Sequence, residues 1–224
     1  MRKLLLIIFS IIIFCTINIP AQIKSLDTRT KVQIQTDSGT IILVLYEETS
    51  LHKGNFLKLV TDNYYNGQFF HRLIKGFMIQ GGDPNSKDSS KFVLLGEGDP
   101  GYTIPAEILP KYFHKKGVLA AAREGNNVNP SKASSGSQFY IVQGNVFTQS
   151  ELDELVSQHR HLTFTEEERT AYMTVGGSPH LDGQYTIFGE ITNGFDVLDK
   201  LMTVPTDQRD RPLTNLIYTI NILK

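Results

Sequence analysis

Short runs in which apolar and polar residues alternate recur along the chain. Val32, Ile34 and Thr36 alternate with polar residues, and Ser38-Gly39 separates this run from a second apolar run over residues 40–46. Alternation with a period of two residues places one face of a strand in a core. A short connection that contains Gly is typical of a hairpin. The pattern therefore predicts a β-hairpin over residues 32–46.

More short apolar segments follow, each interrupted by Gly or Pro. They cover residues 69–72, 77–80, 117–120, 138–142 and 186–190, and a longer apolar segment closes the chain at 215–223. Many short strands separated by turn residues predict an all-β barrel or sandwich.

Two helices are expected beside these strands. Thr49 or Ser50 can cap the first helix, whose predicted buried face consists of Leu51, Phe56, Leu59 and Val60. The second is expected over residues 195–202, because Val197, Leu198 and Leu201 have a helical spacing. Each apolar face can lie against the sheet.

Residues 150–175 do not fit an all-β pattern. Residues 150–153 read Ser-Glu-Leu-Asp and residues 165–168 read Thr-Glu-Glu-Glu. In both, a hydroxyl residue is followed three positions later by an acid, which is the capping-box pattern of a helix start. We predict a helical excursion at about 150–175, inserted between two strands of one domain.

The N-terminus has the order of a secretory signal peptide. Arg2 and Lys3 precede an apolar run over residues 4–14, and the small Ala21 follows. The run is shorter than the roughly 18 to 20 apolar residues that span a membrane. We expect residues 1–21 to be a cleaved signal peptide and 22–224 to be one exported, periplasmic domain without membrane insertion; a membrane anchor at the N-terminus is the alternative.

Composition excludes several classes of function. Cleavage removes Cys15, the only cysteine, so the mature chain is stabilised by its core and not by a disulfide. It also removes Arg2 and Lys3, which leaves 20 Lys and Arg against 23 Asp and Glu and changes the formal charge from −1 to −3. A slightly acidic chain is not typical of nucleic-acid binding. His159 and His161 have no third ligand at a metal-like spacing, so no metal site is expected.

Four blocks of the sequence resemble the cyclophilin family. Residues 70–83, FHRLIKGFMIQGGD, are similar to the cyclophilin signature, and residues 117–122, 135–141 and 181–189 resemble further blocks in the family's order. The resemblance extends from about residue 31 to the C-terminus and is interrupted by the helical excursion. It implies a mainly β fold: a closed eight-stranded antiparallel barrel capped by two helices, with a substrate groove on one outer face.

The resemblance also assigns site residues. It implies that Arg72 is the catalytic arginine. The substrate-binding positions that it implies are Phe77, Met78, Gln80, Ala122, Arg123, Gln138, Tyr140, His180, Leu181 and Tyr185. Many members have tryptophan at position 180 and histidine at position 185, so the groove rim is expected to differ here. Phe77 and Met78 are adjacent and can both face a groove only if the backbone bends near Gly76.

The implied activity is peptidyl-prolyl cis/trans isomerisation. Rotation about the X-Pro bond transfers no proton and uses no nucleophile, so we expect no cofactor. We expect a monomer that acts on proline-containing polypeptides, exported or unfolded, and so assists their folding. One alternative is a proline-peptide-binding chaperone module of the same fold with little turnover. Another is a docking protein whose helical excursion binds a partner.

Overall fold

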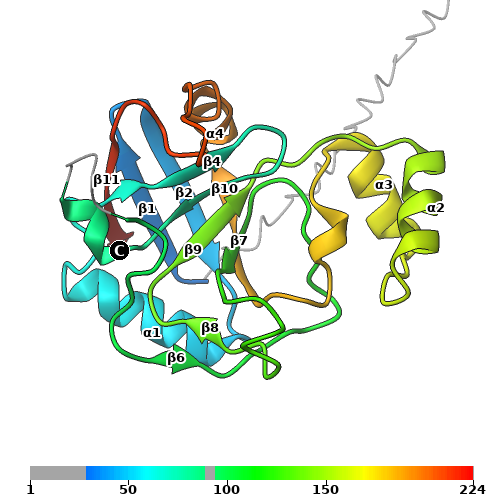
Figure 1. The fold of residues 1–224 in the computed structure, drawn as a ribbon, viewed down its shortest axis with the longest axis horizontal. Coiled ribbons are helices and arrows are strands. Elements are labelled where there is room, and N and C mark those ends of the chain that lie inside the picture. The colour runs from blue at the N-terminus through cyan, green and yellow to red at the C-terminus, as the bar shows by residue number, and fades with distance from the viewer. Residues whose placement is uncertain (1–28, 89–93, 224) are drawn as a thin grey trace, which may run out of the picture.

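Nine antiparallel strands form one sheet that is nearly closed into a barrel (Figure 1). The computed structural model describes residues 29–88 and 94–223, so the signal peptide predicted at 1–21 lies outside the described residues. The strand order is β3-β11-β1-β2-β10-β7-β9-β5-β4. The bounds are β1 Lys31–Thr36, β2 Gly39–Leu45, β3 Phe69–Phe70, β4 Arg72–Ile74, β5 Met78–Gly81, β7 Val118–Ala121, β9 Phe139–Val142, β10 Ile187–Asn193 and β11 Leu216–Leu223.

The predicted N-terminal hairpin is confirmed. β1 and β2 pair antiparallel, with Thr36 opposite Gly39 next to the turn. Val32 and Ile34 are fully buried, as their alternation with polar residues predicts. β11, the predicted terminal strand, pairs along the other edge of β1.

The chain crosses the gap between the two edges of the sheet at His71. The predicted segment 69–72 is divided there: β3 pairs with β11, whereas β4 pairs with β5. The sheet therefore has nine strands where eight were predicted, because one strand is split into two short ones that pair with different neighbours. The single residue between β3 and β4 joins the sheet's two edges covalently.

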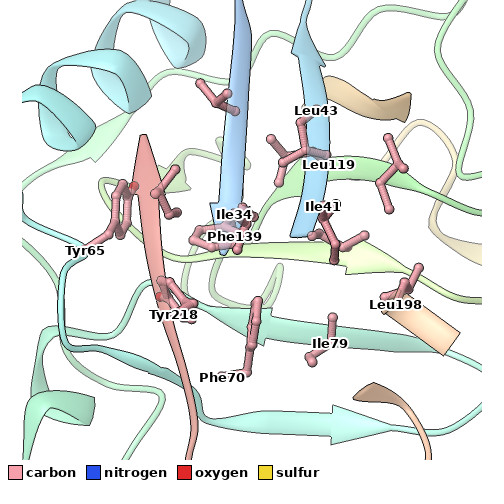
Figure 2. Close-up of a cluster of buried hydrophobic side chains, with 14 of the residues drawn as sticks. Ile34, Ile41, Leu43, Tyr65, Phe70, Ile79, Leu119, Phe139, Leu198 and Tyr218 are labelled. Atoms are coloured by element: carbon pink, nitrogen blue, oxygen red, sulfur yellow. The ribbon is translucent and has the colours of Figure 1, made fainter. Parts of the chain in front are cut away.

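Two helices lie on opposite sides of the barrel, α1 (Ser50–Thr61) and α4 (Phe195–Leu201) (Figure 1). Their apolar faces pack on the inward side chains of the strands in one core, where Phe139 and Tyr218 lie close together (Figure 2). The core side chains that Figure 2 labels are Ile34, Ile41, Leu43, Tyr65, Phe70, Ile79, Leu119, Phe139, Leu198 and Tyr218.

The start of α1 differs from the prediction. Thr49 is the N-cap residue but makes no side-chain capping bond. The Glu107 carboxylate accepts hydrogen bonds from the backbone N–H groups of Leu51 and His52 instead, at 3.1 and 3.0 Å. Leu51, predicted to be buried, is 52% exposed, and His52 is buried in its place. A distant carboxylate therefore satisfies the helix N-terminus that local residues were expected to cap.

The helical excursion contains α2 (Gln149–Gln158) and α3 (Glu166–Thr174), which lie beside the barrel (Figure 1). The capping box predicted at Thr165 and Glu168 is confirmed. The other box was placed wrongly: Thr148 and Glu151 form it, two residues before the predicted Ser150, so α2 starts earlier. Across residues 29–88 and 94–223, no helix has the length and apolar character needed to cross a membrane.

Smaller elements complete the chain. Two short 3-10 helices are η1 (Pro84–Lys87) and η2 (Pro179–Leu181), and a separate two-stranded sheet pairs β6 (Thr103–Ile104) with β8 (Ser134–Ser135).

Gly82 provides a test of the close approach between β5 and the segment before β9. It has φ +90°, and a Cβ there would lie 2.1 Å from the Ser137 carbonyl oxygen. Gly67 also has positive φ, +79°, but a Cβ would meet no atom within 4 Å. We predict that Gly67→Ala lowers the free energy of unfolding by about 1–2 kcal/mol through backbone strain. Gly82→Ala should lower it by about 1–3 kcal/mol more, because the backbone must also move.

Urea denaturation of the two variants and the wild type measures both losses. Because the positive φ is common to the two sites, the difference between the variants isolates the contact with Ser137. Equal losses for Gly67→Ala and Gly82→Ala would show that the backbone at Gly82 relaxes without strain.

Candidate functional site

One row of paired residues crosses the outer face of the barrel. Arg72 of β4 lies opposite Gln80 of β5, Gln80 lies opposite Tyr140 of β9, and Tyr140 lies opposite Ala120 of β7. Directly opposed residues of a sheet point to the same face. Their neighbours along the strands, Leu73, Ile79 and Phe139, belong to the interior core. The pairing register therefore brings Arg72, Gln80 and Tyr140 together on the outside.

The backbone bends before β5, as the sequence required. Gly76 has φ +74°, and the Phe77 N–H donates to the Ile74 carbonyl at 3.0 Å, which closes a turn. Phe77 lies in this turn, and the strand begins only at Met78. The bend allows two consecutive side chains to face the same hollow.

The outer pocket is a hollow of about 160 Å³ on this face. Its lining residues are Arg72, Phe77, Met78, Gln80, Ala122, Arg123, Tyr140, Leu181 and Tyr185. Every one of them is among the predicted catalytic and substrate-binding residues, so the structure brings most of the predicted site together. An apolar cavity of about 150 Å³ can hold a benzene molecule. A five-membered pyrrolidine ring fits within the outer pocket.

Two predicted residues, Gln138 and His180, do not line the outer pocket. Gln138 is buried and accepts a hydrogen bond from the Gln80 amide at 2.9 Å. Its own amide donates to the carbonyls of Gly96 and Gly98 at 3.0 and 2.8 Å. Gln138 therefore fixes the orientation of Gln80 from behind. The His180 ring packs beside the Phe77 ring at a centroid distance of 5.3 Å, so it belongs to the rim.

Arg72 is only loosely held. Its Nε lies 3.4 Å from the Asp210 carboxylate, and the two side chains are 44% and 41% exposed. Exposed ion pairs contribute little to stability. A guanidinium has several N–H donors in one plane, and this pair engages only the Nε group. The terminal nitrogens of Arg72 can therefore face a ligand in the outer pocket.

Arg123 covers the opposite side of the outer pocket. Its guanidinium lies over the Tyr185 ring at 4.6 Å, and its Nε donates to the Gln184 carbonyl at 2.8 Å. The neighbouring Ala122 uses its own N–H and C=O for bonds to Gln138 and Ser135. Within the described residues, the main-chain N–H and C=O of Arg123 have no such bond. Of Ala122 and Arg123, both predicted to bind substrate, Arg123 therefore has the backbone groups that are available to a peptide.

Two residues behind the pocket were missed by the sequence reasoning. His114 Nε2 lies 2.9 Å from the Tyr140 hydroxyl, and its Nδ1 lies 2.8 Å from the Asp182 carboxylate. Burial raises the pKa of Tyr140 well above its usual value, so its hydroxyl stays protonated. Asp182 follows Leu181 in one of the four blocks, but its partners come from distant segments. No local pattern identifies that contact.

Two further features lie outside the outer pocket. Across residues 29–88 and 94–223, no cluster of three or more metal-ligating side chains occurs, and the His159 and His161 rings pack on each other at 5.8 Å. Another hollow, of about 280 Å³, includes Lys111 and Lys115 in its lining. Both lysines pair with carboxylates there, Lys111 with Glu48 and Lys115 with Glu190.

Comparison with known proteins identifies the family. Residues 31–222 match the family model described as "Cyclophilin type peptidyl-prolyl cis-trans isomerase/CLD". The chain belongs to this family. The predicted recognition and the predicted enzyme class, an isomerase, are thereby confirmed.

Individual cyclophilin relatives cover the same region. "Peptidyl-prolyl cis-trans isomerase-like 3" of Gallus gallus is 33% identical over 193 residues, which is 83% of this chain and 90% of the relative. "Peptidyl-prolyl cis-trans isomerase-like 2" of Rhizopus delemar is 33% identical over 198 residues, but this chain spans only 28% of its length. This chain likewise spans only 38% of the length of a relative from Streptococcus pyogenes.

Solved cyclophilin structures share the fold. A Cryptosporidium parvum cyclophilin type peptidyl-prolyl cis-trans isomerase, crystallised in the presence of the dipeptide Ala-Pro, has a TM-score of 0.64 and 27% sequence identity. The likeness covers 87% of this chain and 99% of that chain. The predicted mainly β barrel is confirmed, with nine strands in place of eight.

His71 of this cyclophilin is a buried base beside Arg72. It is 4% exposed, and neither ring nitrogen has a hydrogen-bond partner among the described residues. Burial lowers its pKa from 6.5 to about 4. At a pH between these two pKa values, His71 is protonated in the unfolded chain and neutral in the folded chain. The free energy of unfolding therefore falls as the pH is lowered through this window.

We predict that the wild type loses about 2 kcal/mol more stability than His71→Gln between pH 7 and pH 4.5. Urea denaturation at the two pH values measures this. Carboxylates that do not interact with His71 also titrate in the window, but they contribute equally to both proteins. The difference therefore reports His71 together with its interaction with the Asp83 charge. If the two proteins lose stability in parallel, His71 is not held neutral by its burial.

Proposed function

We propose that this protein isomerises X-Pro bonds of exported or unfolded polypeptides and so assists their folding. The observation that carries the proposal is the outer pocket, a hollow sized for a pyrrolidine ring that combines an apolar wall of Phe77, Met78 and Leu181 with the Arg72 guanidinium. The crystal structure of the Cryptosporidium relative in the presence of Ala-Pro supports a proline-containing ligand.

The barrier to the reaction comes from amide resonance. The nitrogen lone pair is delocalised into the carbonyl, and rotation costs roughly 18 to 20 kcal/mol. Uncatalysed X-Pro exchange takes tens to hundreds of seconds. In the twisted state the nitrogen is pyramidal and its lone pair is localised. A catalyst must bind this state more tightly than the planar one.

Arg72 is placed to supply that difference. A positive charge near the prolyl nitrogen interacts more strongly with the localised lone pair than with the delocalised one. The guanidinium remains charged at all relevant pH values and offers directed N–H donors. The loose contact with Asp210 leaves these donors available, while the Leu73 N–H holds the Asp210 carbonyl at 2.8 Å and keeps the acid beside Arg72.

The other pocket residues hold the substrate while the amide turns. Phe77, Met78 and Leu181 offer an apolar surface that binds the ring without hydrogen bonds favouring one isomer. Gln80, fixed by Gln138, can bind the substrate carbonyl or orient Arg72. All of these residues come from one chain. We therefore propose that the protein acts as a monomer.

The first test removes the guanidinium. Exchange NMR on a short Ala-Pro peptide measures the isomerisation rate for the wild type, Arg72→Ala and Arg72→Lys. We predict that Arg72→Ala loses at least about tenfold in rate, equivalent to about 1.4 kcal/mol. Arg72→Lys should recover only part of this, because a lysine cannot reproduce the planar donors. Arg160→Ala, which removes an exposed arginine of the helical excursion, is the matched control and should retain the full rate.

Two outcomes would contradict the proposal. If the wild type binds the peptide but does not accelerate exchange, the protein is a proline-peptide-binding chaperone module of the same fold. If the wild type is active and Arg72→Ala is equally active, the arginine does not stabilise the twisted amide.

We further propose that residues 1–21 direct export and that the mature domain, residues 22–224, works in the periplasm. The support is the order of basic, apolar and small residues in the sequence. We predict that the full chain, expressed in a host with two membranes, appears in the periplasmic fraction with Gln22 as its first residue. Mass spectrometry of the intact protein measures the N-terminus. An intact N-terminus in the membrane fraction would instead indicate an uncleaved anchor.

A further inference from the structure

A chain of polar groups, buried except for the half-buried Asp182, connects the helical excursion with the wall of the outer pocket. On α3, the Tyr172 hydroxyl donates to one oxygen of the Asp182 carboxylate at 2.5 Å. The other oxygen accepts from the His114 backbone N–H and ring Nδ1, both at 2.8 Å. His114 Nε2 lies 2.9 Å from the Tyr140 hydroxyl. We call Tyr172, Asp182, His114 and Tyr140 the polar network.

The hydrogen bonds of the polar network converge from both sides on the Asp182 carboxylate. A carboxylate only accepts hydrogen bonds, so His114 carries its proton on Nδ1. Nε2 is then an acceptor, and the Tyr140 hydroxyl donates to it. Tyr172 and His114 are fully buried and Tyr140 is 4% exposed. In such surroundings an unpaired polar group is costly, so each member holds the next in one orientation.

The polar network holds two walls of the outer pocket. Tyr140 lines the pocket, and its hydroxyl is anchored by His114. Asp182 directly follows Leu181, another lining residue, at the end of η2, where its N–H bonds to the Pro179 carbonyl at 3.1 Å. A displacement of Asp182 therefore moves Leu181 through the backbone and Tyr140 through His114.

Tyr172 is firmly fixed on the side of the helical excursion. Its ring contacts the rings of Phe113, Phe147 and Phe164 at centroid distances of 5.6, 6.4 and 5.5 Å. A Cβ on Gly177 would lie 2.6 Å from the ring, so only glycine allows this approach. The excursion is thus packed onto the segment that carries η2 and does not project freely from the barrel.

We propose that Tyr172 is a positioning residue for the isomerase: through Asp182 and His114 it sets the separation of Leu181 and Tyr140, and thereby the affinity for the proline ring. The inference rests on the proposed function of the outer pocket. No residue of the helical excursion lines the outer pocket. The inference nevertheless gives the excursion a role in substrate binding there.

The test deletes hydroxyl groups one at a time. Tyr172→Phe retains the ring packing and removes only the bond to Asp182, and Tyr140→Phe removes only the bond to His114. We expect each to raise KM for an Ala-Pro peptide by about threefold to tenfold and to change kcat by less than about twofold. The double variant should be no worse than the more impaired single variant, because both changes break the same network.

A matched control separates this effect from general loss of stability. Tyr112→Phe also removes a hydroxyl that donates to a carboxylate, that of Glu48 at 2.8 Å, but at the other hollow. It should leave KM unchanged. As a spectroscopic check, nitrogen NMR should show His114 protonated at Nδ1 in the wild type, with a changed Nε2 shift in both Tyr140→Phe and Tyr172→Phe.

The outcomes distinguish this inference from the proposed function. An inactive wild type overturns both. An active wild type with unchanged KM in Tyr172→Phe overturns the inference alone, as do single effects that add fully in the double variant. If Tyr172→Phe does not fold, an unchanged KM in Tyr140→Phe still overturns it.

Discussion

The pairing register of β4, β5, β9 and β7 is the constraint on which the site depends. Because successive residues of a strand alternate between two faces, one register decides both the inner core and the outer pocket. Ile79 and Phe139 fill the barrel while Gln80 and Tyr140 face outwards beside Arg72. A shift by one residue would exchange these faces and destroy both at once. Core stability therefore maintains the geometry of the pocket.

The pocket wall has a second support made of polar groups. Gln138 holds Gln80 from one side, and His114 with Asp182 holds Tyr140 from the other. A buried polar group without a partner is costly, so each of these bonds restrains the group that it holds. A residue that lines the outer pocket is thus oriented by a neighbour that does not line it. This arrangement limits the rotation of the pocket side chains before any ligand arrives.

The sequence predicted those features that short segments determine. The hairpin at 32–46 follows from the alternation of neighbouring residues. The grouping of Arg72 with Phe77, Met78 and Gln80, and the bend at Gly76 that it requires, were implied by the resemblance to the cyclophilin family and not by residue spacing. The failures involve distant partners. Glu107 replaces Thr49 as the cap of α1 across more than fifty residues of sequence. Asp182 binds His114, which lies 68 residues earlier in the chain. At His71 one predicted strand is divided into β3 and β4, which pair with β11 and β5 respectively. This pairing depends on closure of the whole sheet, so the local sequence does not predict it.

The position of the last strand has a consequence for synthesis of the chain. β11 lies between β1 and β3, so the first and last described strands pair directly. Synthesis from the N-terminus delivers residues 216–223 after every other described strand. Until then β1 lacks one of its two neighbours and β3 lacks its only neighbour in the sheet. Contacts between such distant segments also make folding slow. The sheet therefore stays open during synthesis until residues 216–223 are available to pair with β1 and β3.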